Sequence, residues 1–374
     1  MNHDQITSLQ LSKVKIPLKF AVSDAKVLTG RQKALEAVDV LVVELTSAQG
    51  IAGMGFSYAL RYGGDGQYAH AMELAPLLLG EDPNDIGKIW HKLLWAGASV
   101  GRSGIAIQAI AAFDTALWDL KAKRAGLSLA KLIGSHHASL PVYNTSGGYL
   151  QAPIEEVVEK AQTALAKGIK GIKMKVGQPD VATDLKRVAT LRQALGDSVP
   201  IMIDANQQWD RVTALRFGRS VEQFNLVWIE EPLNAYDTEG HAALAAALDT
   251  PIATGEMLSS MNEQTALIKN RAVDIIQPDA PRLGGVTPFL KLADMAYDHG
   301  LAMAPHFVME IHIHLAACFP SESWVEHIEW LEPLFNEKLE MTDGRMLVPT
   351  RPGLGLTLSE EMRARTLANK SFRL

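Results

Sequence analysis

The sequence predicts an α/β protein in which a central (β/α)8 barrel, TIM-like in pattern, is covered by an α+β cap built from both ends of the chain. Eight short apolar runs alternate with amphipathic stretches between about residue 140 and Trp330, a rhythm typical of parallel strands and helices closed into a barrel. The N-terminal third has neighbouring strands and one long helical stretch instead, and the rhythm stops after Trp330. We therefore expect a capping domain over residues 1–135, a barrel over 136–332, and a segment over 333–374 that returns to the cap.

The first third of the chain is typical of strands followed by a helix. LQLSKVKIPL at 9–18 favours a strand, and VDVLVVELTSAQGIAGMGFSYA at 38–59 favours a hairpin that turns at AQG, because alternating apolar and β-branched residues fit a pleated sheet. GIAIQAIAAFDTALWDLKAKRAG at 104–126 has the spacing of a long core helix. GGDGQY at 63–68 lacks the strand and helix that flank a phosphate-binding loop, so we expect a mobile loop of the cap.

The middle of the chain supplies the barrel strands, each a short apolar run. Amphipathic stretches such as IEEVVEKAQTALAKG lie between most of them, while EIHIHLAACF at 310–319 fits either a helix or a strand. The eight strand candidates are PVYNTS, GIKMKV, PIMIDAN, LVWIEEP, PIATGE, VDIIQPDA, LAMAPHF and WVEHIEW.

Composition argues against several classes of function. The 374 residues carry a net charge of −6, which disfavours broad binding to nucleic acid or to an anionic membrane. The hydrophobic share of 47% is ordinary for a globular protein, and no run approaches the roughly 18 apolar residues of a membrane span. Cys318 is the only cysteine, which fits a reducing compartment. Because the N-terminus also lacks a signal-like apolar stretch, we expect a cytoplasmic protein.

Carboxylates end three consecutive strand candidates. PIMIDAN ends with Asp204 and Asn206, LVWIEEP contains Glu230, and PIATGE ends with Glu256, so the three acids are spaced 26 residues apart. The carboxyl ends of barrel strands converge on one mouth, where three acids would repel each other unless a cation lay among them. Hard oxygen ligands in this number suit one Mg²⁺ ion. The alternative is three separate acids that are solvated or paired with basic residues; Glu231 must point elsewhere than Glu230.

Two later strands supply an acid and an imidazole. Asp279 in VDIIQPDA and His306 in LAMAPHF are 27 residues apart, again one βα unit. A buried carboxylate beside an imidazole fixes its tautomer and raises its basicity, as a general base requires. The alternative is a helix-capping aspartate next to an unrelated histidine. Glu326 in WVEHIEW either donates a hydrogen bond as a neutral acid or pairs with a lysine.

The stretch GIKMKVG at 171–177 places two lysines on one strand face. Lys173 and Lys175 are two residues apart, so both ammonium groups project to the same side. Neighbouring positive charge disfavours the protonated form, and it can bring the pKa of a lysine from about 10.4 towards roughly 7–8. We therefore expect Lys175 to act as a base opposite His306, and Lys173 to stay charged and hold a substrate carboxylate. Such a site suits removal of a proton next to a carboxylate, because cationic groups stabilise the enediolate that forms.

Taken together, these residues resemble the pattern of the enolase superfamily, and within it the mandelate racemase subgroup. The resemblance rests on the Lys-x-Lys pair, the three strand-end acids, the Asp–His dyad and the final glutamate. It implies that Lys175 and His306 are the acid/base pair, that Asp279 tunes His306, and that Lys173, Asn206 and Glu326 contact substrate. It also implies that one Mg²⁺ ion per active site is bound by Asp204, Glu230 and Glu256.

Within the subgroup, the chain looks similar to the dehydratases (hydro-lyases) of six-carbon sugar diacids such as L-talarate and galactarate. SDAKVLTGRQK, GFSYALRYGGDGQYAH, YNTSGGYL and DANQQWD carry this similarity. It implies loss of water to give a 2-keto-3-deoxy diacid, with some epimerisation as an added outcome. A second carboxylate away from the metal needs donors or a cation, and the candidates lie in the cap: Asp24, Ala25, Lys26, Leu60 and Arg61. Leu60 stands where the family carries a basic residue.

Two other functions remain open from the sequence. A racemase or epimerase of 2-hydroxy acids would use the same two bases, and it would exchange the α-proton without forming a 2-keto product. A sugar-acid-binding protein on the same scaffold would not need the complete set of acids and bases. We expect a homo-oligomer, because barrels of this family often assemble.

Overall fold

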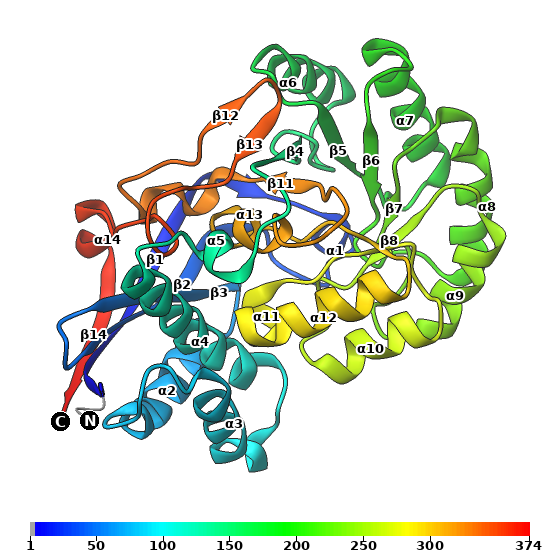
Figure 1. Ribbon diagram of the computed structural model, residues 1–374. Coiled ribbons are helices and arrows are strands. Elements are labelled where there is room, and N and C mark those ends of the chain that lie inside the picture. Colours follow the sequence, from blue (N-terminus) through cyan, green and yellow to red (C-terminus); the bar gives the residue numbers. More distant parts are fainter. Residues whose placement is uncertain (1–3) are drawn as a thin grey trace.

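The chain folds into a four-stranded sheet with helices, the cap, and a parallel barrel beside it (Figure 1). The structure is a computed structural model and describes residues 4–374. The cap sheet has the antiparallel order β14-β1-β2-β3, in which β1 (Ile6–Val22) lies between β14 (Thr366–Arg373) and β2 (Leu35–Ser47), and β3 (Ala52–Leu60) forms the edge. The C-terminal strand thus pairs with the N-terminal one, and the predicted capping domain built from both ends of the chain is confirmed.

Helix α4 (Gly104–Ala125) packs across β3 and forms the centre of the cap, as the spacing of its apolar residues predicts. Glycine at position 55 allows this close approach, because a Cβ on Gly55 would lie 2.2 Å from the carbonyl oxygen of Ala112. The segment GGDGQY is not a loop. It begins helix α2, with Gly63 at φ 106 as the residue before the first turn. The other cap helices are α1 (Ala25–Leu28), α2 (Gly64–Leu74), α3 (Ile86–Ala96) and α5 (Leu129–Ile133), with 3₁₀ turns at Ala75–Leu78 and Ala98–Val100.

The barrel strands follow each other around the barrel in chain order, and β11 returns to pair with β4. All eight predicted runs supply a strand, and every pairing among these strands is parallel. The predicted (β/α)8 barrel is therefore confirmed. The strands are β4 (Ser139–Asn144), β5 (Gly171–Lys175), β6 (Ile201–Asp204), β7 (Ile229–Glu230), β8 (Ile252–Thr254), β9 (Ile275–Ile276), β10 (Ala302–Met303) and β11 (Val325–His327).

Helices lie outside the strands and bury apolar faces against them (Figure 1). Several begin with an aspartate or serine whose side chain accepts from the first-turn amides, for example Asp210 before α8 and Ser260 before α10. The ambiguous EIHIHLAACF supplies a helix, α13. The barrel helices are α6 (Ile154–Ala166), α7 (Val181–Leu195), α8 (Arg211–Val221), α9 (Thr238–Ala247), α10 (Met261–Lys269), α11 (Ala280–Leu283), α12 (Val286–Asp298) and α13 (Met309–Ala316), with a 3₁₀ turn at Glu222–Phe224.

The last part of the chain touches both halves of the molecule. After a 3₁₀ segment at Glu329–Leu334, strand β13 (Arg345–Leu347) pairs with β12 (Met341–Thr342) and with barrel strand β4, before α14 (Glu360–Ala364) and β14 lead back to the cap. The boundaries at 135 and 332 stay predictions. Among residues 4–374, no helix combines the length and apolar character that crossing a bilayer requires.

Candidate active site

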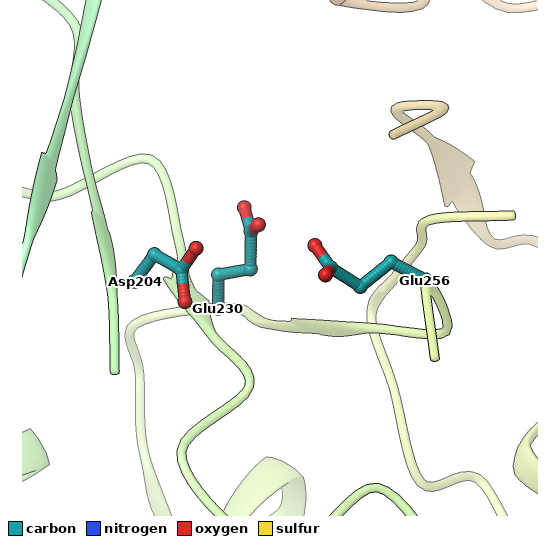
Figure 2. A group of neighbouring side chains, drawn as sticks. All are labelled: Asp204, Glu230 and Glu256. Atoms are coloured by element: carbon teal, nitrogen blue, oxygen red, sulfur yellow. The ribbon is translucent and has the colours of Figure 1, made fainter. Parts of the chain in front are cut away.

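Three carboxylates meet at the mouth of the barrel, facing one another (Figure 2). Asp204 ends β6, Glu230 ends β7, and Glu256 lies two residues beyond β8. One oxygen from each lies within 4.8 Å of the others, and all three side chains are buried. Parallel strands end at one edge, so the 26-residue spacing in the sequence becomes a cluster in space.

Glu230 lies at the centre of a hydrogen-bond network. Its Oε2 accepts from Trp228 Nε1 at 3.0 Å and from Gln277 Nε2 at 2.8 Å, while its Oε1 lies 2.7 Å from Lys173 Nζ. Burial, together with the charges of Asp204 and Glu256, raises the pKa of Glu230 to about 8, even though Lys173 opposes this. The cluster thus carries more negative charge than the buried lysines neutralise, which is the environment that a divalent cation relieves.

Lys175 donates a hydrogen bond to Oδ2 of Asp204, whose Oδ1 accepts from the backbone amide of Asn206 at 2.8 Å. Burial favours neutral Asp204, but Lys175 and Lys173 outweigh it and lower the pKa of this carboxyl below its usual value. From the sequence, the positive charge of neighbouring groups is expected to lower the pKa of Lys175. In the structure the opposite holds: burial lowers this pKa, but the adjacent Asp204 carboxylate, together with Glu230 and Glu256, outweighs burial and raises it.

His306 and Asp279 form the predicted dyad. Asp279 follows β9 and His306 follows β10, and His306 Nδ1 lies 2.8 Å from Asp279 Oδ2. The other ring nitrogen, Nε2, faces Oε2 of Glu256 at 3.4 Å. Asp279 is fully buried, and burial favours its neutral form, but the hydrogen bond from His306 and the positive charge of Arg282 and His306 together outweigh burial and lower the carboxyl pKa. Asp279 also caps a helix, as the alternative supposed, because its Oδ1 accepts from the amide of Arg282 in α11 at 3.0 Å, but the histidine beside it is its hydrogen-bond partner.

Glu326 pairs with a lysine, which was one of its two predicted roles. Its Oε1 lies 2.7 Å from Lys173 Nζ and accepts from Thr145 Oγ1 at 2.6 Å, and its Oε2 accepts from the amide of Phe307 at 2.8 Å. Lys173 therefore sits between two carboxylates, those of Glu326 and Glu230. It is only 1% exposed, so most of its charge is satisfied inside the protein.

A cavity of about 360 Å³ opens over these groups and is roofed by the cap. Lys175 and His306 both line it, as do Lys173, Asn206, Glu256 and Glu326. The cap contributes four of the five residues that the sequence singled out: Asp24, Lys26, Leu60 and Arg61. Ala25 does not line the cavity; it is buried behind it, with its Cβ facing Gly177.

The two cap residues Arg61 and Asp24 are already paired. Arg61 Nη2 lies 3.1 Å from Asp24 Oδ2, and Arg61 Nε donates to the carbonyl of Lys33 at 2.6 Å. Asp24 also caps α1 by accepting from the amides of Lys26 and Val27. The guanidinium of Arg61, which lines the cavity, is thus held in place by Asp24 and by the carbonyl of Lys33.

Strained backbone gathers around the mouth of the barrel. Asn206, Gln207, Glu231, Phe307 and Val308 all have positive φ although none is glycine. Such conformations cost free energy and concentrate at functional sites. Here they change the direction of the chain within the first residues after Asp204, Glu230 and His306.

Sequence reasoning missed several residues at the site. Tyr58 donates a hydrogen bond to Asp279 Oδ2 at 2.5 Å, and Arg282 Nη1 lies 3.6 Å from Glu256 Oε1. Glu231 is buried near the acids, where burial raises its pKa to about 8. Arg282 could have been predicted from the sequence, because it lies three residues after Asp279, about one helical turn along the chain. Tyr58 could not, because it comes from the cap and no local pattern links it to Asp279.

These features define a capped barrel whose mouth combines a cluster of three acids with an amine and an imidazole. Two family profiles match the chain: one described as "Enolase C-terminal domain-like" over residues 156–362, and one for the mandelate racemase / muconate lactonizing enzyme N-terminal domain over residues 20–134. The chain belongs to the enolase superfamily, in the mandelate racemase / muconate lactonizing enzyme branch, which confirms the resemblance that its sequence indicated.

Characterised relatives cover nearly the whole chain. It is 61% identical over 369 residues to the L-talarate/galactarate dehydratase of Salmonella typhimurium, covering 99% of this chain and 93% of the relative. A crystal structure of that dehydratase with Mg and L-lyxarohydroxamate matches with a TM-score of 0.98 at 60% identity, covering 100% of this chain and 95% of the other. An L-talarate dehydratase from Polaromonas sp. JS666, complexed with Mg and L-glucarate, matches with a TM-score of 0.97 at 61% identity, over 99% and 100%.

Proposed function

We propose that this protein is a Mg²⁺-dependent hydro-lyase that removes water from a six-carbon sugar diacid, L-talarate and/or galactarate, to give a 2-keto-3-deoxy diacid. The observation that carries the proposal is the cavity that Lys175, His306 and Glu256 of the acid cluster line together, under a cap that offers Lys26 and Arg61. The identity of 61% to a dehydratase of these two diacids supports the same substrate class.

One Mg²⁺ ion would be held by Asp204, Glu230 and Glu256. The residues fit this role because their carboxylates are buried and face one another, and because burial and the charges of Asp204 and Glu256 raise the pKa of Glu230 to about 8. When bound, such an ion supplies positive charge next to the substrate carboxylate and stabilises the negative charge that develops there.

Lys175 and His306 are the proposed acid/base pair. One of them takes the proton from the carbon next to the substrate carboxylate, and the negative charge that remains spreads onto the carboxylate oxygens. The other, in its protonated form, gives a proton to the hydroxyl on the next carbon, so that the C–O bond breaks and water leaves. The enol that results takes up a proton on the carbon that lost the hydroxyl and gives up the proton on its own oxygen, which yields the 2-keto acid. Because Asp204 holds the pKa of Lys175 high, a basic lysine requires that the charge of Asp204 be shared with a cation.

Other residues would orient the substrate. We propose that Asp279 fixes the tautomer of His306, since it accepts from Nδ1 at 2.8 Å. Lys173, Asn206 and Glu326 line the cavity floor and would contact the reacting end of the diacid. In the cap, Lys26 and Arg61 would meet the distal carboxylate, and Asp24 and Leu60 would shape that end of the cavity.

Two bases in one cavity also fit a racemase or epimerase. Relatives with other activities exist: one with 35% identity over 350 residues is a 3,6-anhydro-alpha-L-galactonate cycloisomerase from Streptomyces coelicolor.

A panel of mono- and diacid sugars with Mg²⁺, assayed for 2-keto acid formation in D₂O, separates these functions. We expect a 2-keto product from galactarate or L-talarate. Deuterium exchange without that product would favour an epimerase, and no turnover on any acid would favour a binding protein. Full dehydration by a Lys175→Ala variant would remove this lysine from the mechanism.

Three further features are part of the proposal. We propose domain boundaries near residues 135 and 332, a homo-oligomeric state, and a cytoplasmic location. The last agrees with the single cysteine, Cys318, which is partly buried and whose thiol pKa is raised to about 12 by burial.

A further inference from the structure

We propose that Tyr58 of the cap is a positioning residue for the reaction: its hydroxyl holds the Asp279 carboxylate in the orientation that aims His306 into the cavity. The expected effect on catalysis rests on the proposed function, whereas the contacts of Tyr58 are features of the structure itself. Tyr58 lies on β3, far from the barrel in sequence, and is 1% exposed. Its hydroxyl lies 2.5 Å from Asp279 Oδ2, the same oxygen that faces His306 Nδ1 at 2.8 Å.

The backbone on either side of the dyad is fixed by a different residue. His312, a buried histidine of α13, accepts from the amide of Ala280 at 3.0 Å and donates through Nδ1 to the carbonyl of Phe307 at 2.9 Å. Ala280 follows Asp279, and Phe307 follows His306. His312 thus ties together the two segments that carry the dyad, and what remains free is the rotation of the two side chains.

The Asp279 carboxylate has three donors, and each restricts that rotation. Oδ1 accepts from the amide of Arg282 at 3.0 Å, and Oδ2 accepts from Tyr58 and His306. Without the tyrosine, Oδ2 would have only the imidazole, and the Arg282 amide at Oδ1 would be the one remaining contact that directs the carboxylate towards it. A hydrogen bond from an uncharged hydroxyl to a buried carboxylate is strong, because both groups have lost water.

The ring of Tyr58 is itself held on two sides. It packs edge-on against Phe307 at 4.9 Å between ring centroids, and the guanidinium of Arg282 lies 5.5 Å from its centroid. Both partners belong to the barrel mouth. The hydroxyl therefore has a fixed position only when the cap is docked on the barrel, so the cap completes the acid/base machinery as well as enclosing the substrate.

The test compares Tyr58→Phe, which removes one oxygen, with Tyr68→Phe. Tyr68 is a second buried tyrosine of the cap that packs in the α2 core with Leu74 and Leu78. With galactarate and Mg²⁺, we expect Tyr58→Phe to lower kcat by about tenfold, the rate equivalent of one hydrogen bond to a charged group. KM should stay within about twofold of the parent, because the aromatic ring, which lines the cavity, is kept. Tyr68→Phe should leave kcat unchanged. Equal kcat values in the two variants would overturn the proposal.

A double-mutant cycle with Asp279→Asn distinguishes positioning from a general structural effect. If Tyr58 acts through Asp279, the double variant should be no slower than Asp279→Asn alone. Full additivity of the two losses would show that Tyr58 acts elsewhere, and the proposal would fail.

A readout that needs no turnover separates this inference from the proposed function. In ¹⁵N-histidine NMR of the full chain, the Nδ1 proton of His306, assigned with a His306→Asn variant, should move downfield in Tyr58→Phe, because Oδ2 then accepts from a single donor. An unmoved resonance would refute the contact in solution. Failure of every sugar acid to react with the parent protein, with a resonance that does move, would refute the proposed function and leave the positioning role intact.

Discussion

The ammonium of Lys173 lies 2.7 Å from Oε1 of Glu326, and this buried ion pair joins β5 to β11, the two strands on either side of β4. Glu230 lies at the same distance from the other side of the ammonium. One lysine thus neutralises carboxylates from two other strands. Burial lowers the pKa of Lys173, but Glu230 and Glu326 outweigh burial, and the pKa is raised well above its usual value.

Removing this charge should destabilise the fold. In Lys173→Met, the Glu326 carboxylate, whose pKa Lys173 lowers, would remain buried and charged without its partner, and breaking such a pair from one side costs about 3–5 kcal/mol. Urea unfolding at pH 7 should show this loss. Lys269→Met, at the exposed end of α10, is the matched control and should change the free energy of unfolding by less than about 1 kcal/mol. A Lys173→Met protein as stable as the parent would mean that the pair contributes little.

Mg²⁺ should stabilise the protein through the acid cluster. A ligand that binds only the folded state at a hundred times its Kd adds about 2.7 kcal/mol to the free energy of unfolding. We expect a higher Tm with added Mg²⁺ and a return to the starting value with EDTA. Glu256→Gln should lose this response. Glu239→Gln, a side chain that is 90% exposed on α9, should keep it. A Tm shift that persists in Glu256→Gln would place the ion elsewhere.

The cap should discriminate diacids from monoacids through Arg61. We expect Arg61→Gln to raise KM for galactarate by about tenfold or more, which is the loss of one charge-assisted hydrogen bond. It should affect six-carbon monoacids far less, because they have no distal carboxylate. Steady-state kinetics with both substrate types measures the difference. Arg31→Gln, an exposed residue of the neighbouring loop, serves as the control. Equal effects on both substrate types would contradict a role in diacid recognition.

The strand-end residues could be predicted because residues spaced one βα unit apart in the sequence lie close together at the mouth of a barrel. Asp204, Glu230 and Glu256 each follow an apolar run, and parallel strands bring such positions to one edge. The pairing of His306 with Asp279 follows from the same rule applied to the next two strands. The family resemblance added their roles.

Other parts of the site depend on docking between segments that are distant in sequence. Tyr58 reaches Asp279 only because the cap lies over the barrel, and no local pattern encodes this contact. The sign of the pKa shift of Lys175 was also beyond sequence reasoning, since the argument weighed Lys173 but not the contact with Asp204. Helix α13 was ambiguous for a different reason: it is buried on all sides, so it shows no amphipathic period.

Glu310 in that same helix should make stability depend on pH. Its side chain is buried, and neither carboxylate oxygen has a hydrogen-bond partner among the described residues. Burial raises the pKa of Glu310 to about 8, from 4.5 for an ordinary glutamate. Between these two values the folded state binds a proton that the unfolded state releases, so the free energy of unfolding falls as pH rises, by up to about 1.4 kcal/mol per pH unit.

The Glu310→Gln variant keeps the shape of the side chain and cannot titrate. We expect it to be more stable than the parent at pH 8, and we expect the difference to shrink towards pH 5, where the parent glutamate is protonated in the folded state. Urea unfolding of both proteins across this range measures the two slopes. Since Glu310 lies outside the cavity lining, galactarate turnover by the variant at pH 7 should match that of the parent. Parallel stability curves would show that the carboxyl group is charged in the folded protein and has found a partner.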